Sequence, residues 1–343
     1  MQPPRVPGQA VRRVAMTAVG ACLPERVLSN ADFERMVDTS DRWIRARTGI
    51  RERRVVEKGT GASVLAAAAA RDALARRGMD PEDIDLIVVA TVTPDTFVPA
   101  TNCLVQHLIG ARNAWGFDLN AACSGFNFGL AAVTQFVASG AVERALLIGA
   151  DVMSTITDYQ DRTTCILFGD AAGAVLLEPA QDGEGILGFH HKVDGSGSDL
   201  LVVPAGGSRL PASHDTVDNR QHYLRQDGRR VFRFAVRSSA DAAVELLEEL
   251  DIAREEVAFL VCHQANARII DAIAKRLGMP QEQVVKTVHK YGNTTAASIP
   301  TALRDALDGE RIAPGDILLF SSVGAGLTIG TSVVRWGGER GPA

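Results

Sequence analysis

The chain alternates between short apolar runs and longer segments with the spacing or composition of helices. Residues 83–93, 145–150 and 257–262 form apolar runs that are typical of strands buried on both faces of a parallel sheet. Residues 62–77 are alanine-rich, which favours a helix, and Gly78 is suited to end it. This alternation of strands and helices predicts an α/β fold.

The second half of the chain repeats the pattern of the first half. Three segments recur in the same order, and the pairs are 81–89 with 254–261, 145–150 with 316–321, and 169–177 with 326–334. This order predicts two similar α/β halves, each with a mostly parallel sheet between layers of helices.

The repeats place the boundary between the halves near residue 180. We therefore expect an N-terminal half over residues 14–180 and a C-terminal half over residues 181–336. Residues 1–13 and 337–343 are rich in proline or glycine and predict flexible tails. Residues 180–228 are rich in Gly, Ser, Asp and His, and they predict a crossover made of irregular loops.

Cys123 lies where a strand turns into a helix. Residues 115–120 alternate between apolar and polar side chains, as a strand does, and apolar residues recur at helical spacing from Phe126 to Val137. Backbone N–H groups at a helix start have no internal partner, and the dipole is positive there. Both effects predict a lowered pKa and a nucleophilic thiolate. The alternative is a buried, inert cysteine.

Composition excludes several classes of function. The formal net charge of −5 argues against nucleic-acid binding, and no apolar run approaches the length of a membrane helix. Five scattered cysteines predict neither a disulfide framework nor a metal site, and they fit a reducing, cytoplasmic compartment. The first residues lack the apolar stretch of a signal peptide. We expect a cytoplasmic enzyme.

Two polar residues in the second half are candidate partners of Cys123. His263 directly follows the strand predicted over residues 257–262, and Asn293 lies in a polar stretch before another helix. Open α/β sheets place their chemistry beyond the carboxyl ends of the strands, so Cys123 and His263 can meet in one cleft. His263 and Asn293 also have structural interpretations. His263 can be a buried histidine whose hydrogen bonds are satisfied, and Asn293 can be an asparagine in a turn. Cys262 is predicted to be structural.

Five motifs carry a resemblance to a known family. They are DTSDRWIRARTGIRER at residues 38–53, AACSGF at 121–126, FGDAAGA at 168–174, HQANAR at 263–268 and YGNTTAASIP at 291–300. In this order they resemble the motifs of β-ketoacyl-acyl-carrier-protein synthase III, over residues 14–336. The resemblance implies the thiolase fold, a five-layered αβαβα pair of similar halves, and a homodimer.

The resemblance also implies a reaction. An acyl-CoA starter and malonyl-acyl carrier protein condense with loss of CO2, which initiates fatty-acid synthesis. Cys123 would carry the acyl group, and the N–H groups of Cys123 and Ala325 would bind the oxyanion. Neutral His263 and the Asn293 amide would both donate hydrogen bonds to the enolate oxygen. The reaction requires no metal or redox cofactor. Acyl-CoA is a substrate and not a cofactor.

Further residues receive binding roles from the same resemblance. Trp43 and Arg162 would sandwich the adenine of CoA, Arg47 would bind its phosphate, and Asn266 its pantetheine arm. The basic, tryptophan-containing stretch at residues 39–54 independently suits stacking and phosphate binding, although a solvated loop is the alternative. The acyl pocket would contain Phe168 and Phe97, the latter reaching across the dimer.

Acyl carrier proteins are acidic, so a basic docking surface is expected. The predicted docking residues follow His263 or lie near it: Gln264, Ala265, Asn266, Ala267, Arg268, Arg233, Lys275 and Arg276. The alternative is a solvated helix face.

Three positions depart from the family pattern and two other functions stay open. Val323 replaces a common aromatic residue, Ala325 replaces the middle glycine of a Gly-Gly-Gly motif, and Arg229 stands where some members have asparagine. These departures leave the choice of acyl group open. A starter enzyme of secondary metabolism is one alternative. A thioester-cleaving cysteine hydrolase is the other, because papain-like enzymes have the same Cys, His, Asn order. A non-catalytic scaffold that binds carrier protein is disfavoured, because all three polar groups are present.

Overall fold

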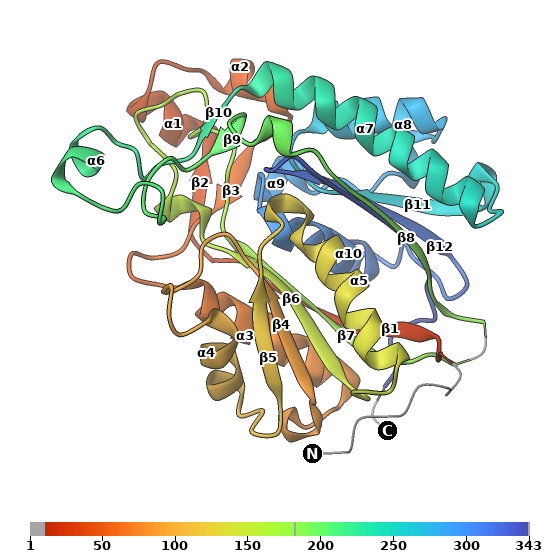
Figure 1. Cartoon of the computed structure of the whole chain (residues 1–343). Coiled ribbons are helices and arrows are strands. Elements are labelled where there is room, and N and C mark those ends of the chain that lie inside the picture. Colours follow the sequence, from red (N-terminus) through yellow and green to blue (C-terminus); the bar gives the residue numbers. More distant parts are fainter. Residues whose placement is uncertain (1–10, 182, 342–343) are drawn as a thin grey trace.

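Two β-sheets, one from each half of the chain, lie on either side of a pair of helices (Figure 1). The computed structural model describes residues 11–181 and 183–341. The first sheet has the strand order β1-β7-β6-β4-β5. Its strands are β1 (Val14–Cys22), β4 (Leu86–Ala90), β5 (Trp115–Leu119), β6 (Ala145–Asp151) and β7 (Ala171–Pro179). β4 is parallel to β5 and β6, whereas β7 is antiparallel to β1 and β6.

The second sheet repeats this arrangement in the order β11-β12-β13-β8. Its strands are β8 (Gly185–Val193), β11 (Val257–Cys262), β12 (Ile317–Gly324) and β13 (Thr328–Arg335). β11 and β12 are parallel, and β13 is antiparallel to β12 and β8. The repeated segments form equivalent strands: β4 corresponds to β11, β6 to β12 and β7 to β13. The predicted pair of similar halves is confirmed.

Helices lie between the two sheets and on their outer faces. The central pair is α5 (Gly125–Ala138) and α10 (Ser298–Asp308) (Figure 1). α3 (Ala62–Arg77) and α4 (Thr101–Ile109) cover the first sheet. α7 (Gly228–Glu249) and α8 (Ala267–Leu277) cover the second. These are the five layers expected from the family resemblance.

The central layer is held by apolar side chains from both halves. Phe126 of α5 and Leu303 of α10 share one buried cluster with Val88 of the first sheet and Phe320 of the second. The rings of Phe126 and Phe320 meet edge to face, with centroids 6.2 Å apart. This shared core fixes the two halves to each other, and so it fixes the ends of their strands relative to one another.

One expectation about the crossover is wrong. Residues 180–228 were expected to form irregular loops, but β8 is a nine-residue strand at the edge of the second sheet. Most of its residues are only half-buried, and it contains His190, His191 and Lys192. An edge strand does not need a continuous apolar run, so its polar composition concealed it.

Shorter elements connect these layers. Short strands and helices are β2 (Val27–Ser29), α1 (Asn30–Met36), α2 (Asp41–Thr48), β3 (Glu52–Arg54), β9 (Leu201–Val202), α6 (His214–Asp218), β10 (Arg225–Gln226) and α9 (Val288–Tyr291). Single 3₁₀ turns are η1 (Pro81–Asp83), η2 (Ala122–Ser124), η3 (Met153–Thr155), η4 (Gly195–Gly197), η5 (Arg254–Glu256), η6 (Gln281–Gln283) and η7 (Thr295–Ala297).

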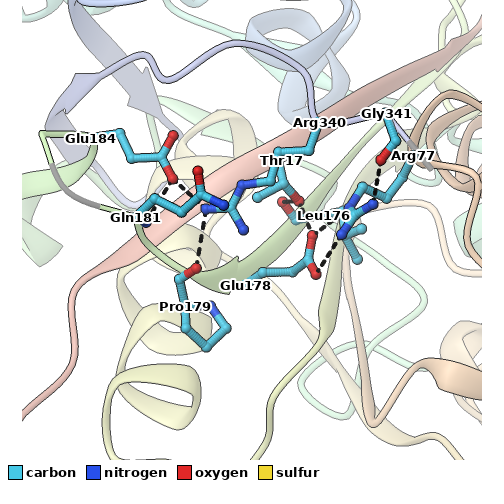
Figure 2. Close-up of polar contacts among 9 residues, drawn as sticks. All are labelled: Thr17, Arg77, Leu176, Glu178, Pro179, Gln181, Glu184, Arg340 and Gly341. Atoms are coloured by element: carbon cyan, nitrogen blue, oxygen red, sulfur yellow. Dashed lines mark hydrogen bonds and ion pairs between the residues drawn. The ribbon is translucent and has the colours of Figure 1, made fainter. Parts of the chain in front are cut away.

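The predicted C-terminal tail, residues 337–343, contacts both halves of the chain where the structure describes it. Arg340 pairs with Glu184, and Arg77 donates a hydrogen bond to the carbonyl of Gly341 (Figure 2). Charged side chains thus hold residues 339–341, while the predicted flexibility of this tail stays a prediction. Residues 342–343 lie outside the described residues.

At the other end, residues 1–10 of the predicted N-terminal tail lie outside the described residues. Arg12 pairs with Glu143 (2.8 Å) and donates a hydrogen bond to the carbonyl of Val137 (2.9 Å). The last residues of this predicted tail are thus held against the end of α5.

Candidate active site

Cys123 lies in a tight turn between β5 and α5. The backbone at Ala122 is left-handed, with φ of 50°, and the side-chain oxygen of Asn120 accepts a hydrogen bond from the Ala122 N–H (3.1 Å). The turn continues as η2 directly into α5. Cys123 is therefore placed next to the helix N-terminus, as the sequence predicted.

The thiol of Cys123 is buried, with 8 % of its surface exposed. Burial raises the pKa of Cys123 to about 12, and the charge of Asp151 adds to the rise. The expected lowering of this pKa by the helix terminus is therefore wrong for the resting enzyme. A protonated thiol needs a proton acceptor before it can attack a thioester.

His263 follows β11 and is also buried. Its backbone N–H donates a hydrogen bond to the carbonyl of Ser321 (2.8 Å), and its ring Nδ1 lies 2.7 Å from the hydroxyl of Ser298. That hydroxyl donates its hydrogen to the carbonyl of Thr295 (2.7 Å), so Nδ1 carries the proton and donates to Ser298. Burial lowers the pKa of His263 to about 4, so the ring is neutral at pH 7. Nε2 of the neutral ring is then a proton acceptor.

Asn293 lies in a turn that repeats the turn before Cys123. The side-chain oxygen of Asn293 accepts a hydrogen bond from the Thr295 N–H (3.0 Å), and φ of Thr295 is 49°. η7 and α10 follow, just as η2 and α5 follow Asn120. Because its amide oxygen is used by the backbone, the NH2 group of Asn293 is the end that can donate to a ligand. The duplication thus places a helix start from each half at the site.

One cavity of about 520 Å³ brings the three candidate catalytic residues together. Cys123, His263 and Asn293 all line it, as does the predicted acyl-pocket residue Phe168. The backbone of Phe168 pairs with that of Asn293, which places the Phe168 loop beside the site. A thiol, a neutral imidazole and an amide that line one cavity are suited to nucleophilic acyl chemistry.

Comparison with known proteins identifies the family. Models of 3-oxoacyl-[acyl-carrier-protein] synthase III and of its C-terminal part match residues 117–195 and 247–336. A β-ketoacyl-[acyl-carrier-protein] synthase III from Koribacter versatilis is 50% identical over 329 residues, covering 95% of this chain and 99% of the relative. The chain belongs to the β-ketoacyl-acyl-carrier-protein synthase III family. It is an acyl-transferring condensing enzyme.

Solved structures agree with this assignment. The chain is similar to a β-ketoacyl-[acyl carrier protein] synthase III from Thermus thermophilus, with 43% identity, a TM-score of 0.89, and coverage of 94% of this chain and 99% of that one. It is also similar to the priming β-ketosynthase of the R1128 polyketide pathway, with 36% identity, a TM-score of 0.89, and coverage of 97% and 98%. The predicted thiolase-type fold is confirmed.

Residues expected to bind CoA in this synthase family gather at the outer end of the cavity. Trp43, Arg47 and Asn266 line it. The guanidinium of Arg162 lies 5.2 Å from the centroid of the Trp43 ring, and that of Arg47 lies 6.0 Å from it. Arg162 also pairs with Asp38 (3.1 Å). The aromatic ring and two cations thus lie together, and their role in binding CoA stays a prediction.

Asn266 already has structural partners. Its side-chain oxygen accepts from the Arg268 N–H (2.8 Å), which caps α8, and its NH2 group donates to the carbonyl of Arg47 (3.1 Å). Asn266 therefore joins α8 to α2, and this contact positions Arg47 at the cavity.

The predicted docking residues separate into distinct groups. Arg268 and Arg233 are exposed at the cavity, and the Arg268 guanidinium lies 5.5 Å from the centroid of the Phe232 ring. Ala265 lines the same cavity. Lys275 and Arg276 are exposed further along α8, and Arg276 pairs with Asp241 (2.5 Å).

Two of those docking residues have structural roles instead. Gln264 is 1 % exposed, and its side chain bonds to the carbonyls of Cys262 and Val285 and to the N–H of Thr287. The prediction that Gln264 contacts the carrier protein is therefore wrong, because its polar atoms serve the backbone. Ala267 packs closely against Gly49. A Cβ atom added to Gly49 would lie only 2.5 Å from the methyl carbon of Ala267.

Phe97 does not line the cavity within one chain. Its side chain is 85 % exposed, as is the neighbouring Val98 at 87 %. The assignment of Phe97 to the acyl pocket thus requires a second copy of the chain and stays a prediction.

Ala325, the predicted second oxyanion donor, lies in the turn between β12 and β13. Gly324 packs so closely on the Cys123 turn that an added Cβ would lie 2.7 Å from the Cys123 amide nitrogen. Thr328 bonds to the carbonyls of both Ala121 and Ala325 (3.1 and 3.3 Å). The turn is therefore tied to the Cys123 backbone, while Val323 lines the cavity itself.

Sequence reasoning overlooked Ser298 and Asp151. Ser298 was visible only as part of a motif, and its contact with His263 spans two elements. Asp151 ends a buried strand at the same sheet edge as Cys123, and a polar residue at that position is a signal that could have found it. Among residues 11–181 and 183–341, no group of three or more His, Cys, Asp or Glu side chains is arranged to hold a metal ion.

Proposed function

We propose that this family member condenses an acyl-CoA starter with malonyl-acyl carrier protein to give 3-oxoacyl-acyl carrier protein, CoA and CO2. This reaction begins fatty-acid synthesis. The observation that carries the proposal is the convergence of Cys123, His263 and Asn293 on one cavity. The family membership and the relatives' names support the same reaction class.

In the first half-reaction His263 accepts the thiol proton. Nε2 of the neutral ring takes the proton of Cys123, and the thiolate attacks the acyl-CoA carbonyl. The N–H groups of Cys123 and Ala325 hold the oxyanion. The C–S bond to CoA breaks, and the CoA thiolate takes the proton from Nε2 of His263 as it leaves. The ring is then neutral again, as burial favours.

In the second half-reaction malonyl-acyl carrier protein loses CO2 to form an enolate. His263 takes up the proton that the decarboxylative condensation consumes, and its Nε2–H and the NH2 group of Asn293 donate hydrogen bonds to the enolate oxygen. The enolate carbon attacks the acyl-Cys123 thioester and expels the thiolate. Nε2 returns its proton to Cys123, which restores the resting enzyme. His263 thus acts in both half-reactions, and Asn293 in the second.

The outer end of the cavity suits a nucleotide-bearing thioester. Trp43 and Arg162 hold the adenine ring, and Arg47 binds a phosphate of CoA. Arg268 and Arg233 attract the acidic carrier protein to the same opening. No metal or redox cofactor takes part in these steps, and acyl-CoA is consumed as a substrate.

A homodimer is the proposed assembly. β5 is the edge of the first sheet, and its exposed Trp115 forms an aromatic cluster with Phe117 and Phe136. An unpaired edge with apolar side chains is suited to pairing with a second copy. Phe97 and Val98 would be covered in the same assembly, with Phe97 reaching the partner's acyl pocket.

The proposed location is the cytoplasm. All five cysteines are free, which fits a reducing compartment. Within the described part of the chain, no helix has both the length and the apolar character needed to span a bilayer. Nucleic acids and membranes are not proposed as partners.

A priming role in secondary metabolism is a second candidate. The observation that favours it is the similarity to the R1128 priming β-ketosynthase over nearly the whole chain. The two roles differ in the acyl group and in the carrier protein that accepts it. A panel of acetyl-, branched- and medium-chain acyl-CoA with each carrier protein separates them.

The experiment that tests the proposal follows both half-reactions. Acyl-CoA should add one acyl mass to the enzyme at Cys123, and Cys123→Ala should gain none. Adding malonyl-acyl carrier protein should release CO2 and give the 3-oxoacyl product. Hydrolysis without formation of a C–C bond, or an acyl group on Cys103, Cys165 or Cys262, would contradict it.

A further inference from the structure

Asp151 is a buried carboxylate at the end of β6, outside the lining of the cavity. Its exposed fraction is 0 %, and it lies where the first half of the chain meets the turn that carries Asn293. Buried carboxylates are uncommon unless their oxygens are hydrogen-bonded. The partners of Asp151 therefore indicate what it does.

One oxygen of Asp151 binds the turn that follows β4. Oδ1 accepts hydrogen bonds from the Thr91 hydroxyl (3.1 Å), the Val92 N–H (2.7 Å) and the Thr93 hydroxyl (3.0 Å). The Thr93 hydroxyl itself accepts from the Val152 N–H (2.8 Å), so its hydrogen is available to Asp151. All of these contacts lie within the first half.

The other oxygen crosses into the second half. Oδ2 accepts a hydrogen bond from the Thr295 hydroxyl and a longer one from the Ala296 N–H (3.4 Å). Burial raises the pKa of Asp151, whereas the hydroxyl and N–H donors that face both oxygens stabilise the ionised, acceptor-only carboxylate.

Thr295 connects Asp151 to both residues that hold the enolate. Its N–H donates to the side-chain oxygen of Asn293, and its carbonyl accepts from the Ser298 hydroxyl that holds His263. Thr295 has a left-handed backbone, with φ of 49°, which is unfavourable for a β-branched residue and needs support from its surroundings.

We propose that Asp151 is a positioning residue that anchors Thr295 and thereby sets Asn293 and His263 for decarboxylation. The inference rests on the proposed function, because it assigns decarboxylation to those two side chains. Asp151 also acts on Cys123 through its negative charge, which opposes ionisation of the thiol. Loss of that charge therefore has opposite effects on the two parts of the site.

The test compares Asp151→Asn with the parent enzyme in separate assays. Asparagine has the same shape as aspartate, but its NH2 group would face hydroxyl and N–H groups that donate hydrogen bonds to Asp151 and cannot all accept one. CO2 release from malonyl-acyl carrier protein by the acylated enzyme should fall roughly 10²-fold, as a small misplacement of catalytic groups does. Alkylation of Cys123 by iodoacetamide at pH 7 should become faster, and its pH profile should move to lower pH. Because unfolding would also expose Cys123 and speed its alkylation, the result counts only if Asp151→Asn keeps the parental circular dichroism spectrum and melting transition.

Thr295 supplies an independent variant if Asp151→Asn does not fold. Thr295→Val removes the hydroxyl and should slow CO2 release, whereas Thr295→Ser keeps it and should restore the rate. The matched control is Glu178→Gln, another buried carboxylate with hydroxyl and N–H donors, at the opposite end of the sheet. It should lower the melting temperature without changing either assay on the site.

Two results would overturn the inference. One is a folded Asp151→Asn enzyme that releases CO2 at the parental rate. The other is equal loss of CO2 release in Thr295→Val and Thr295→Ser. Failure of the proposed function is a different result, because the parent enzyme itself would then release no CO2 and form no 3-oxoacyl product.

Discussion

At the scale of single residues, burial keeps Cys123 and His263 in their neutral forms, although the proposed reaction needs both to become charged. Cys123 must become a thiolate, yet burial holds its proton. His263 must accept a proton, yet burial disfavours the charged ring. The two costs offset each other when the proton moves from Cys123 to His263, because the resulting opposite charges attract strongly in a buried site. In the proposed mechanism, the pair activates the thiol, and the helix terminus alone does not.

The raised pKa of Cys123 predicts the pH dependence of its alkylation. In the resting enzyme, with a pKa of about 12, the thiolate fraction grows about tenfold for each pH unit throughout the neutral and mildly alkaline range. Iodoacetamide labelling of Cys123, followed by mass spectrometry, should therefore keep rising between pH 7 and pH 10. The exposed Cys103 is an internal control, and a plateau for Cys123 below pH 8 would contradict the prediction.

His263 and Asn293 should be separable by their effects on the two half-reactions. His263→Ala should slow both acylation and CO2 release, because His263 accepts the thiol proton and later donates to the enolate. Asn293→Ala should spare acylation and slow CO2 release by roughly 10²–10³-fold, the effect of losing one preorganised donor. Acylation by acyl-CoA and CO2 release are measured side by side. Normal acylation in His263→Ala would show that the helix terminus, and not His263, activates Cys123.

At the scale of elements, α8 links the cavity to its entrance. Asn266 caps this helix and holds the Arg47 backbone, while Arg268 in the first turn is exposed over Phe232. One helix start thus positions a residue predicted to bind CoA beside one predicted to meet the carrier protein. In the proposed reaction, the two substrates use neighbouring parts of one opening, one after the other.

Arg268→Glu should impair only the second substrate. Reversal of the charge should raise the KM for malonyl-acyl carrier protein and alter its salt dependence, because attraction of an acidic partner is lost. Acylation by acyl-CoA should be nearly unchanged. Arg112→Glu, an exposed residue that does not line the cavity, is the charge-matched control. Loss of both half-reactions in Arg268→Glu would argue against a docking role.

At the scale of the whole molecule, a buried ion pair joins the C-terminal segment to the first sheet. Arg77 of α3 pairs with Glu178 of β7 (2.8 Å), which also accepts from the Thr17 hydroxyl (2.5 Å), and Arg77 holds the carbonyl of Gly341 (Figure 2). Although burial opposes it, hydrogen bonds from Arg77 and Thr17 lower the pKa of Glu178. Sequence-distant parts of the chain meet at this pair.

Arg77→Ala should destabilise the fold by about 3–5 kcal/mol, because it leaves Glu178 buried without its cation. The control is Arg76→Ala on the same helix, a partly exposed arginine whose loss should cost at most about 1 kcal/mol. Urea unfolding measures both. Because the folded-state pKa of Glu178 is lowered, its contribution is present at neutral pH and is lost as the pH falls through the acidic range. The difference between the variants should therefore shrink in acid.

Local patterns in the sequence were sufficient for the main elements and for choosing Cys123, His263 and Asn293 as candidates. The alanine-rich helix ends at Gly78 as predicted, since glycine adopts the left-handed backbone found there, with φ of 65°. The turn with Cys123 and the repeated strands follow from spacing alone. These features depend on neighbours along the chain, and the repetition of whole segments revealed the two halves.

Contacts between distant segments account for what the sequence left open. The pKa of Cys123 depends on burial and on Asp151, and the tautomer of His263 depends on Ser298, which is 35 positions away in the chain. Gln264 lies inside the docking motif, but folding turns its side chain into the interior. β8 forms a strand because β13 offers an edge to pair with. Composition and periodicity report local preference, whereas burial and pairing arise only when separate elements pack together.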